Sequence, residues 1–162
     1  MMKLLLLLLM TVLLSCSTVK AKAKLNCHRN HGHLCTIHML YPGVRRPTLK
    51  DMIEAAQEHI PDNRTYANNE RAHCIPDPGP AHNVDGKIFP NAALCVWPEW
   101  VGPSEGLGGK RIKELMRVLL EKKNCMQCGH ISVTFVPGHP DKTTGEVTVG
   151  VVPDINVIGD NG

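Results

Sequence analysis

The chain has 162 residues, of which 43% are hydrophobic and only 4% aromatic, and 18 Lys and Arg against 15 Asp and Glu give it a formal charge of +3. This length suits one ordinary domain with a core of its own. Three of the basic residues and none of the acidic ones precede residue 24. The remaining chain is therefore near neutral, and its charge does not indicate binding to nucleic acid or anionic lipid.

The N-terminus carries an uninterrupted apolar run over residues 4–14. It is shorter than the roughly 20 apolar residues that a membrane span needs, but it fits the core of a signal peptide. Small residues predict cleavage that makes residues 1–21, or 1–23, the signal peptide. Residues 24–162 are then a single cysteine-rich extracellular domain, and no later segment is long and apolar enough to be transmembrane.

A bacterial lipoprotein is the alternative for this leader. The residues that end at Cys16 resemble a lipobox, in which the cysteine carries lipid. Cleavage further along removes Cys16 and leaves an even number of cysteines, which favours secretion.

Six cysteines follow the leader. In an oxidising compartment such a set usually forms structural disulfides. Six cysteines allow 15 pairings, and the sequence does not choose among them. The predicted disulfide residues are Cys27, Cys35, Cys74, Cys95, Cys125 and Cys128.

The first predicted helix covers residues 49–60. Thr48 is a suitable N-cap, Asp51 stands three residues on as a capping-box partner, and Pro61 ends the segment. Its apolar residues recur on one helical face, at Leu49, Met52, Ile53, Ala56 and Ile60.

The stretch over residues 61–109 is rich in Pro and Gly turn signals. We expect mainly irregular structure there, with two short strands over residues 87–89 and 93–97. A second amphipathic helix is predicted over residues 110–123, with an apolar stripe and two lysines in its last turn.

The C-terminal part alternates between apolar and small polar residues, which is typical of strands. Residues 131–135 and 147–151 form a predicted antiparallel hairpin, and residues 155–158 a third strand. The predicted fold class is therefore α+β: a small disulfide-stabilised domain with two amphipathic helices packed on a C-terminal antiparallel hairpin or small sheet.

The pair Cys125-Met-Gln-Cys128 invites interpretation as a redox, haem or zinc site. It follows a helix C-terminus, whereas redox cysteines sit at N-termini. Gly129 separates it from His130, and no second Cys-x-x-Cys completes a zinc site. We expect both cysteines to form structural bonds with distant partners rather than with each other.

The histidines near Cys27 are the weak candidates for a metal site. Neutral imidazoles bind zinc or copper, and His28, His31 and His33 lie close together in sequence. The alternative is a solvated loop that happens to be rich in histidine. We predict no cofactor and no metal.

Two kinds of processing signal occur. Asn63-Arg64-Thr65 is an N-glycosylation sequon after the Pro61 helix stop, which predicts a glycoprotein if the cell is eukaryotic. The dibasic pair Arg45 and Arg46 lies in a turn and is a modest candidate for proteolytic processing.

No catalytic motif occurs: the sequence lacks GxSxG, HExxH and phosphate-binding glycine loops. We predict that the protein is not an enzyme. Trp97 and Trp100 form the predicted binding patch, since Trp is enriched where proteins bind each other. The alternative is that both tryptophans belong to the core.

The segment over residues 95–153 resembles the interleukin-17 type of cytokine. Cys95-Val-Trp97-Pro98 is similar to a motif of that family, and the pair Cys125 and Cys128 and a strand ending at Gly150 follow in the same order. The family's terminal Cys-x-Cys is missing. The resemblance implies a cytokine-like ligand.

These features predict a secreted extracellular ligand or effector that binds an extracellular protein or cell-surface receptor, and not nucleic acid. A secreted metal-binding protein or small hydrolase that uses the N-terminal histidines is one alternative. A toxin or antimicrobial effector is another. The near-neutral charge after cleavage argues against simple membrane disruption, which favours strongly cationic surfaces.

Overall fold

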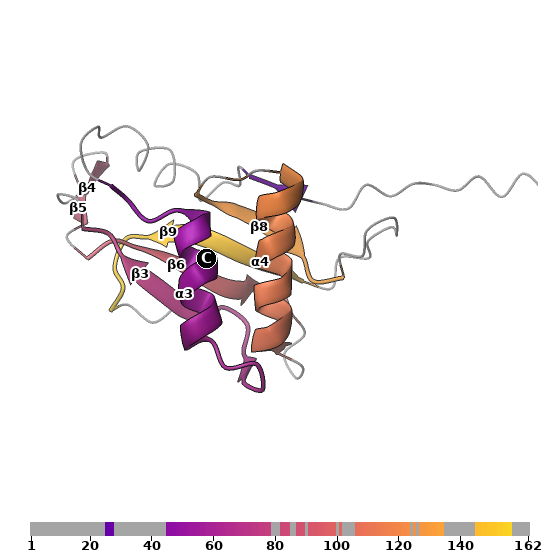
Figure 1. The fold of residues 1–162 in the computed structure, drawn as a ribbon. Helices are drawn as coiled ribbons and strands as arrows, with labels where there is room; N and C mark the ends of the chain where they lie inside the picture. Colours follow the sequence, from indigo (N-terminus) through magenta and orange to yellow (C-terminus); the bar gives the residue numbers. More distant parts are fainter. Residues whose placement is uncertain are drawn as a thin grey trace, which may run out of the picture.

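The structure is a computed structural model. It describes residues 25–27, 45–78, 82–84, 87–89, 91–99, 101, 106–123, 125, 127–134 and 145–156. Two helices lie side by side on one face of an antiparallel sheet (Figure 1). The predicted class, a small disulfide-stabilised α+β domain, is confirmed.

The main sheet has five strands in the order β1-β8-β9-β6-β3. Each strand is antiparallel to its neighbours. The strands are β1 (Leu25–Asn26), β3 (His73–Pro76), β6 (Ala93–Glu99), β8 (Gly129–Ser132) and β9 (Glu146–Val152). Two small pairs accompany them, β2 (Thr65–Tyr66) with β7 (Leu107–Gly108), and β4 (His82–Val84) with β5 (Lys87–Phe89).

Helix α3 (Leu49–His59) begins as the sequence predicts. The Thr48 side chain accepts a hydrogen bond from the Asp51 backbone, and the Asp51 carboxylate accepts one from the Thr48 backbone at 2.8 Å. This capping box satisfies two backbone donors that the first turn leaves without partners. Leu49, Met52 and Ala56 are buried against the sheet side of the domain.

Helix α4 (Gly109–Lys123) begins directly against the end of α3. A Cβ atom on Gly109 would lie 2.2 Å from the carbonyl oxygen of Pro61, so only glycine allows this approach. Farther along, Arg117 Nη2 donates to Gln57 Oε1 at 3.0 Å across the two helices. The predicted apolar stripe of α4 is buried, at Ile112, Leu115, Met116 and Leu119.

The core lies between the helices and the sheet. Alternate residues of the three central strands face it, because successive side chains of a strand point to opposite faces. Burying each large aliphatic side chain contributes roughly 1.5–3 kcal/mol. The strand residues in this core include Leu94, Val96, Ile131, Val147, Val149 and Val151.

Two disulfides have both partners within the described residues. Cys27–Cys125 joins β1 to the segment after α4, and Cys74–Cys95 joins directly opposed residues of β3 and β6. Cys128 is also disulfide-bonded, to a partner outside the described residues. Cys125 and Cys128 therefore bond to other cysteines and not to each other, which confirms the sequence prediction.

Three details of the predicted fold need correction. The sheet is not only C-terminal, because β6, which contains the predicted strand over residues 93–97, and β3, which was not predicted, form nearly half of it. Strand β8 ends at Ser132, where a turn begins. The described part of the predicted third strand, Ile155 and Asn156, is also a turn, and only Asp154 forms an isolated bridge, with Asn91.

Candidate functional site

The sheet face opposite the helices carries a row of polar side chains. His130, Thr148 and Trp97 are neighbours across β8, β9 and β6, and Ser132 and Glu146 form the next pair. Residues of this face are withdrawn from water: His130, Ser132 and Thr148 are each at most 3% exposed. A sheet with one free face normally turns such residues to solvent, so their burial marks the polar row as the strongest candidate site in the described chain.

Two carboxylates lie opposite each other in the polar row. Glu99 and Glu146 are direct cross-strand partners, and side chains in that relationship share one face. Trp97 Nε1 donates to Glu99 Oε1 at 2.6 Å, and His130 Nε2 lies 3.7 Å from Glu146 Oε2. The Trp97 donor offsets part of the cost of holding the Glu99 carboxylate away from water.

The hydroxyls of the polar row differ in their hydrogen bonding. Ser132 Oγ lies 3.3 Å from Thr134 Oγ1, within hydrogen-bond distance. Thr148 Oγ1 is buried and makes no hydrogen bond to any described residue. No group of three or more metal-ligating side chains occurs within the described ranges.

The other half of the same face is apolar. Trp97 lies over Gly150, since a Cβ atom built there would come within 2.9 Å of the indole ring. The Trp97 side chain packs with Ala93, Cys95 and Val152 in a small second cluster and is partly buried. It therefore contributes to packing, and its role in a binding patch stays a prediction. Trp100 lies outside the described residues.

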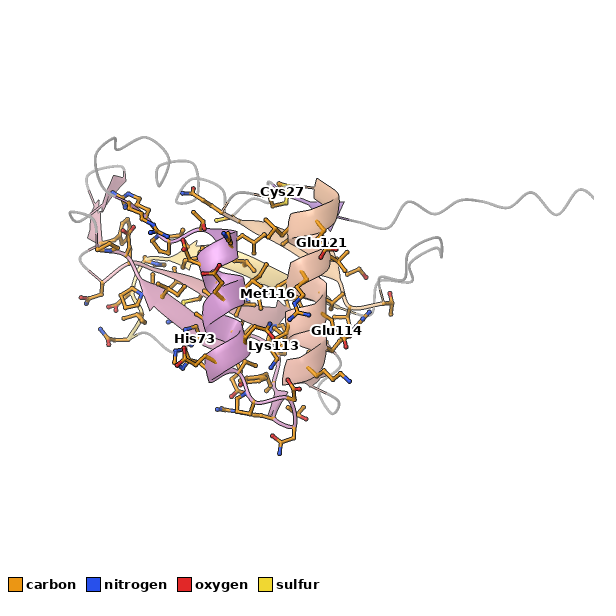
Figure 2. The ribbon with its side chains drawn as sticks, viewed as in Figure 1. Cys27, His73, Lys113, Glu114, Met116 and Glu121 are labelled. Carbon is orange, nitrogen blue, oxygen red and sulfur yellow. A yellow bond between two sulfur atoms is a disulfide. The ribbon has the colours of Figure 1, made fainter. Side chains whose placement is uncertain are left out.

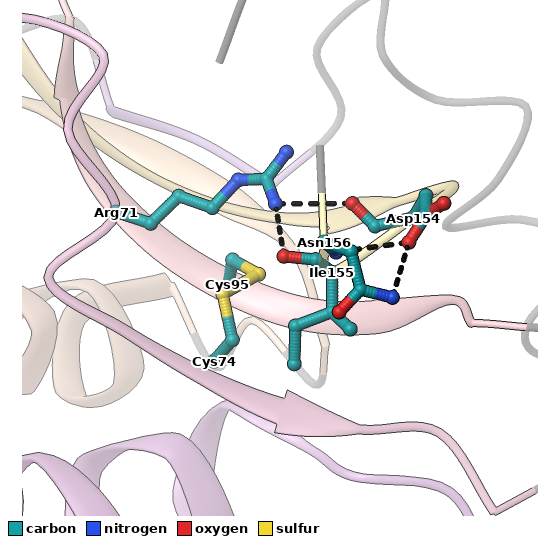
Figure 3. The surroundings of a disulfide bond; sticks show 6 residues. All are labelled: Arg71, Cys74, Cys95, Asp154, Ile155 and Asn156. Carbon is teal, nitrogen blue, oxygen red and sulfur yellow. Dashed lines mark hydrogen bonds between the residues drawn. A yellow bond between two sulfur atoms is a disulfide. The ribbon is translucent and has the colours of Figure 1, made fainter. Parts of the chain in front are cut away.

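The chain after β9 is fixed beside the Cys74–Cys95 disulfide. Arg71 Nη1 donates to the backbone carbonyls of Asp154 and Ile155 at 3.0 and 2.9 Å (Figure 3). The Asp154 carboxylate accepts from the Asn156 backbone at 2.9 Å. These bonds fix the C-terminal end of the sheet against the edge formed by β3.

Two histidines stack at the C-terminal end of α3. The rings of His59 and His73 are 4.9 Å apart between centroids. Burial lowers the pKa of His73 below its ordinary value of 6.5, and the charge of His59 lowers it further. Figure 2 shows His73 and Lys113 toward the same end of the helices, with Cys27 toward the opposite end.

The dibasic pair is divided by the fold. Arg45 is exposed, with 88% of its side chain accessible, and forms an ion pair with Asp51 at 2.9 Å. Arg46 is 3% exposed and forms an ion pair with Asp77. A protease that must bind both side chains has no access to Arg46 in the folded domain, so the structure disfavours processing here.

The remaining predicted site residues are divided between described and undescribed segments. Asn63 is exposed in the turn between α3 and β2. The histidines His28, His31 and His33, and also Cys35, lie outside the described residues, so the weak metal candidates stay a prediction. Neither α3 nor α4, the helices of the described ranges, has the length and hydropathy to cross a bilayer.

Sequence reasoning missed the charged members of the polar row. Glu99, His130 and Glu146 come from three strands, and only the register of the sheet brings them together. Their signal in the sequence is alternation: His130 and Glu146, for example, directly precede the core residues Ile131 and Val147. Alternation alone predicts a solvated face, which is why the buried state was not foreseen.

Comparison with known proteins identifies a family. The family model that matches is Kp4, over residues 9–153. No curated protein and no solved structure matches significantly. The interleukin-17 resemblance is therefore wrong: it rested on a few shared motif residues in residues 95–153 and lacked the terminal cysteines. Because the Kp4 match covers most of the sequence, the chain belongs to the Kp4 family, a family of fungal killer toxins.

Proposed function

We propose that the protein is a secreted toxin of the killer type, which acts on other cells from outside. The observation that carries this proposal is the match to the Kp4 family over residues 9–153. It favours the toxin alternative of the sequence analysis over the cytokine-like ligand. The N-terminal leader is then a signal peptide removed before residue 22 or 24.

The disulfides support life outside the cytosol. Cys27–Cys125 and Cys74–Cys95 each close a loop within the domain, and Cys128 forms a further bond. Such bonds persist in oxidising surroundings and are rare in the cytosol. They also restrict the unfolded chain and so protect a small protein from unfolding and proteolysis.

The toxin is proposed to act by binding a protein on the target cell. After leader cleavage the chain is nearly neutral, which does not suit simple membrane disruption. The cross-linked sheet supplies a rigid frame, and rigid frames reduce the entropy lost on binding.

A small hydrolase is the second candidate, because His130 and Glu146 stand together on the sheet. The two candidates differ in what the histidine does. A binding toxin retains its effect when His130 becomes Gln, provided that the fold is intact. A hydrolase that uses His130 for proton transfer loses most of its rate, since such groups typically contribute about 10²–10⁴-fold.

Growth inhibition tests the proposed function. The protein secreted by a eukaryotic host, purified without reductant, is added to cultures of a panel of fungal strains. We expect dose-dependent inhibition of at least one strain. The same protein, reduced and alkylated, is the matched control and is expected to be inactive. Folded protein that inhibits no strain contradicts the proposal.

A further inference from the structure

The sequon Asn63-Arg64-Thr65 lies where the turn after α3 leads into β2. Arg64 N donates to the carbonyl of Pro61 at 3.3 Å, which closes the turn. Figure 1 shows this segment extending past α3 and the start of α4. Asn63 and Thr65 are both exposed, and the Asn63 amide makes no hydrogen bond to any described residue.

The residues on either side of Asn63 are tied to the domain. Asp62 forms an ion pair with Lys113, whose Nζ also donates to the carbonyl of Ile60 at 3.0 Å. Arg64 Nη2 donates to Glu70 Oε1 at 2.6 Å, and its guanidinium lies 4.7 Å from the Tyr66 ring centre. All three side chains are exposed, but those of Asp62 and Arg64 each pair with a neighbouring charged residue, whereas the Asn63 amide makes no such contact with the described residues.

Backbone N–H groups at the start of α4 form hydrogen bonds with the same turn. Gly109 N donates to the carbonyl of Arg64 at 2.8 Å, and Lys110 N to that of Asp62 at 3.3 Å. These bonds use two of the first N–H groups of α4, which the helix leaves without intrahelical partners. The turn is thus a built part of the fold, so a modification of Asn63 does not disturb the core.

We propose that Asn63 carries an N-linked glycan and that this glycan covers the end of the helical layer. The donor is a lipid-pyrophosphate-linked oligosaccharide of the secretory pathway. A bond forms between Asn63 Nδ2 and the anomeric carbon of the sugar, and the bond from that carbon to the pyrophosphate breaks. The lipid pyrophosphate leaves, and the amide nitrogen loses one proton.

The position of the glycan has a consequence for the toxin. A branched sugar on Asn63 shields the surface around Asp62, Arg64 and the start of α4. The surface that contacts the target cell is therefore elsewhere on the domain. This inference rests on the proposed function only in its requirement for secretion from a eukaryotic cell.

Matched substitutions at Thr65 test the glycan. The sequon needs a hydroxyl residue at this position. Thr65→Ser keeps the sequon, whereas Thr65→Val removes the hydroxyl but keeps Asn63 and the methyl group that packs near Gly106. Each protein is secreted by a eukaryotic host, and its mass is measured before and after enzymatic removal of N-glycans.

We expect the native protein and Thr65→Ser to lose a glycan mass on treatment, and Thr65→Val and Asn63→Gln to lose none. Native protein that is secreted and inhibits growth but carries no glycan at Asn63 overturns the inference and leaves the toxin proposal standing. Because the surface that the glycan shields is proposed not to contact the target cell, Thr65→Val is predicted to retain full growth inhibition. Folded Thr65→Val with strongly reduced inhibition contradicts that claim.

Discussion

Arg46 and Asp77 form an ion pair whose side chains are 3% and 1% exposed, although 31 residues separate them in the chain. It ties the segment before α3 to the end of β3. Removing one member leaves the other charge buried without its ion-pair partner, which typically costs about 3–5 kcal/mol. We predict that Arg46→Ala lowers the free energy of unfolding by this amount in chemical denaturation.

Arg45→Ala is the matched control for this prediction. Arg45 also pairs with an aspartate, Asp51, but it is largely exposed, and surface pairs contribute at most about 1 kcal/mol. Equal losses of unfolding free energy for Arg45→Ala and Arg46→Ala would show that the buried ion pair contributes no more to stability than the exposed one.

The two disulfides are predicted to differ in their contribution to stability. Cys27–Cys125 spans 98 residues and Cys74–Cys95 spans 21. The loop-entropy relation gives about 4–5 kcal/mol for the first and roughly 3 kcal/mol for the second. Replacing each pair with alanines and measuring urea unfolding tests the order. A larger loss from the Cys74 and Cys95 replacement would mean that packing in the sheet outweighs chain entropy.

The third disulfide is predicted to join Cys35 to Cys128. Cys128 is bonded, and the four cysteines of the two pairs above are used. Only Cys16 and Cys35 remain in the sequence, and signal cleavage removes Cys16. Peptide mapping of the secreted, non-reduced protein is expected to recover this link. A peptide that joins Cys16 to Cys128 would contradict leader cleavage.

The polar row yields two predictions of opposite sign. Trp97→Phe removes the donor to Glu99 but keeps a ring over Gly150, and hydrogen bonds to charged groups contribute about 1.5–3 kcal/mol. We expect Trp97→Phe to lower the free energy of unfolding by that amount.

Thr148→Val replaces a buried hydroxyl that lacks a described partner with an isosteric methyl, and is expected to raise the free energy of unfolding by about 1 kcal/mol. Thermal and urea unfolding measure both, and destabilisation by Thr148→Val would mean that its hydroxyl is hydrogen-bonded in solution.

His73 makes stability depend on pH. Its pKa is lowered in the folded state by burial and by His59, so the unfolded chain binds more protons below pH 6.5. The contribution of neutral His73 to the free energy of unfolding is fully present above pH 6.5. It is lost as the pH falls below 6.5 and through the lower pKa of the folded state. The free energy of unfolding, measured from pH 8 to pH 5, should decrease more steeply for the native protein than for His73→Gln. His59→Gln removes only the smaller of the two causes and is expected to keep most of the slope, whereas identical slopes for native protein and His73→Gln would refute the prediction.

Local signals predicted the local structure. The capping box of Thr48 and Asp51, the Pro61 stop and the two apolar stripes depend on residues within one or two turns of each other. The hairpin of β8 and β9 followed from alternation in the same way. Strand β3 was missed because His73-Cys-Ile-Pro76 is short and ends in proline, and because it becomes a strand only by pairing with β6.

Long-range relationships were beyond the sequence. The burial of Arg46 requires Asp77, and the polar row requires the register of three strands, neither of which composition or periodicity specifies. Family membership was missed for a related reason. A few conspicuous residues around Cys95 and Trp97 suggested a cytokine, whereas the family pattern is spread over residues 9–153.

The measurement that tests the central claim most directly is binding of the labelled, secreted protein to cells of a strain whose growth it inhibits. We predict saturable binding that unlabelled native protein displaces and reduced, alkylated protein does not. His130→Gln is predicted to bind and to inhibit as the native protein does. An inhibitory preparation that binds without saturation, or a His130→Gln variant that binds normally but no longer inhibits, would contradict a toxin that acts by binding.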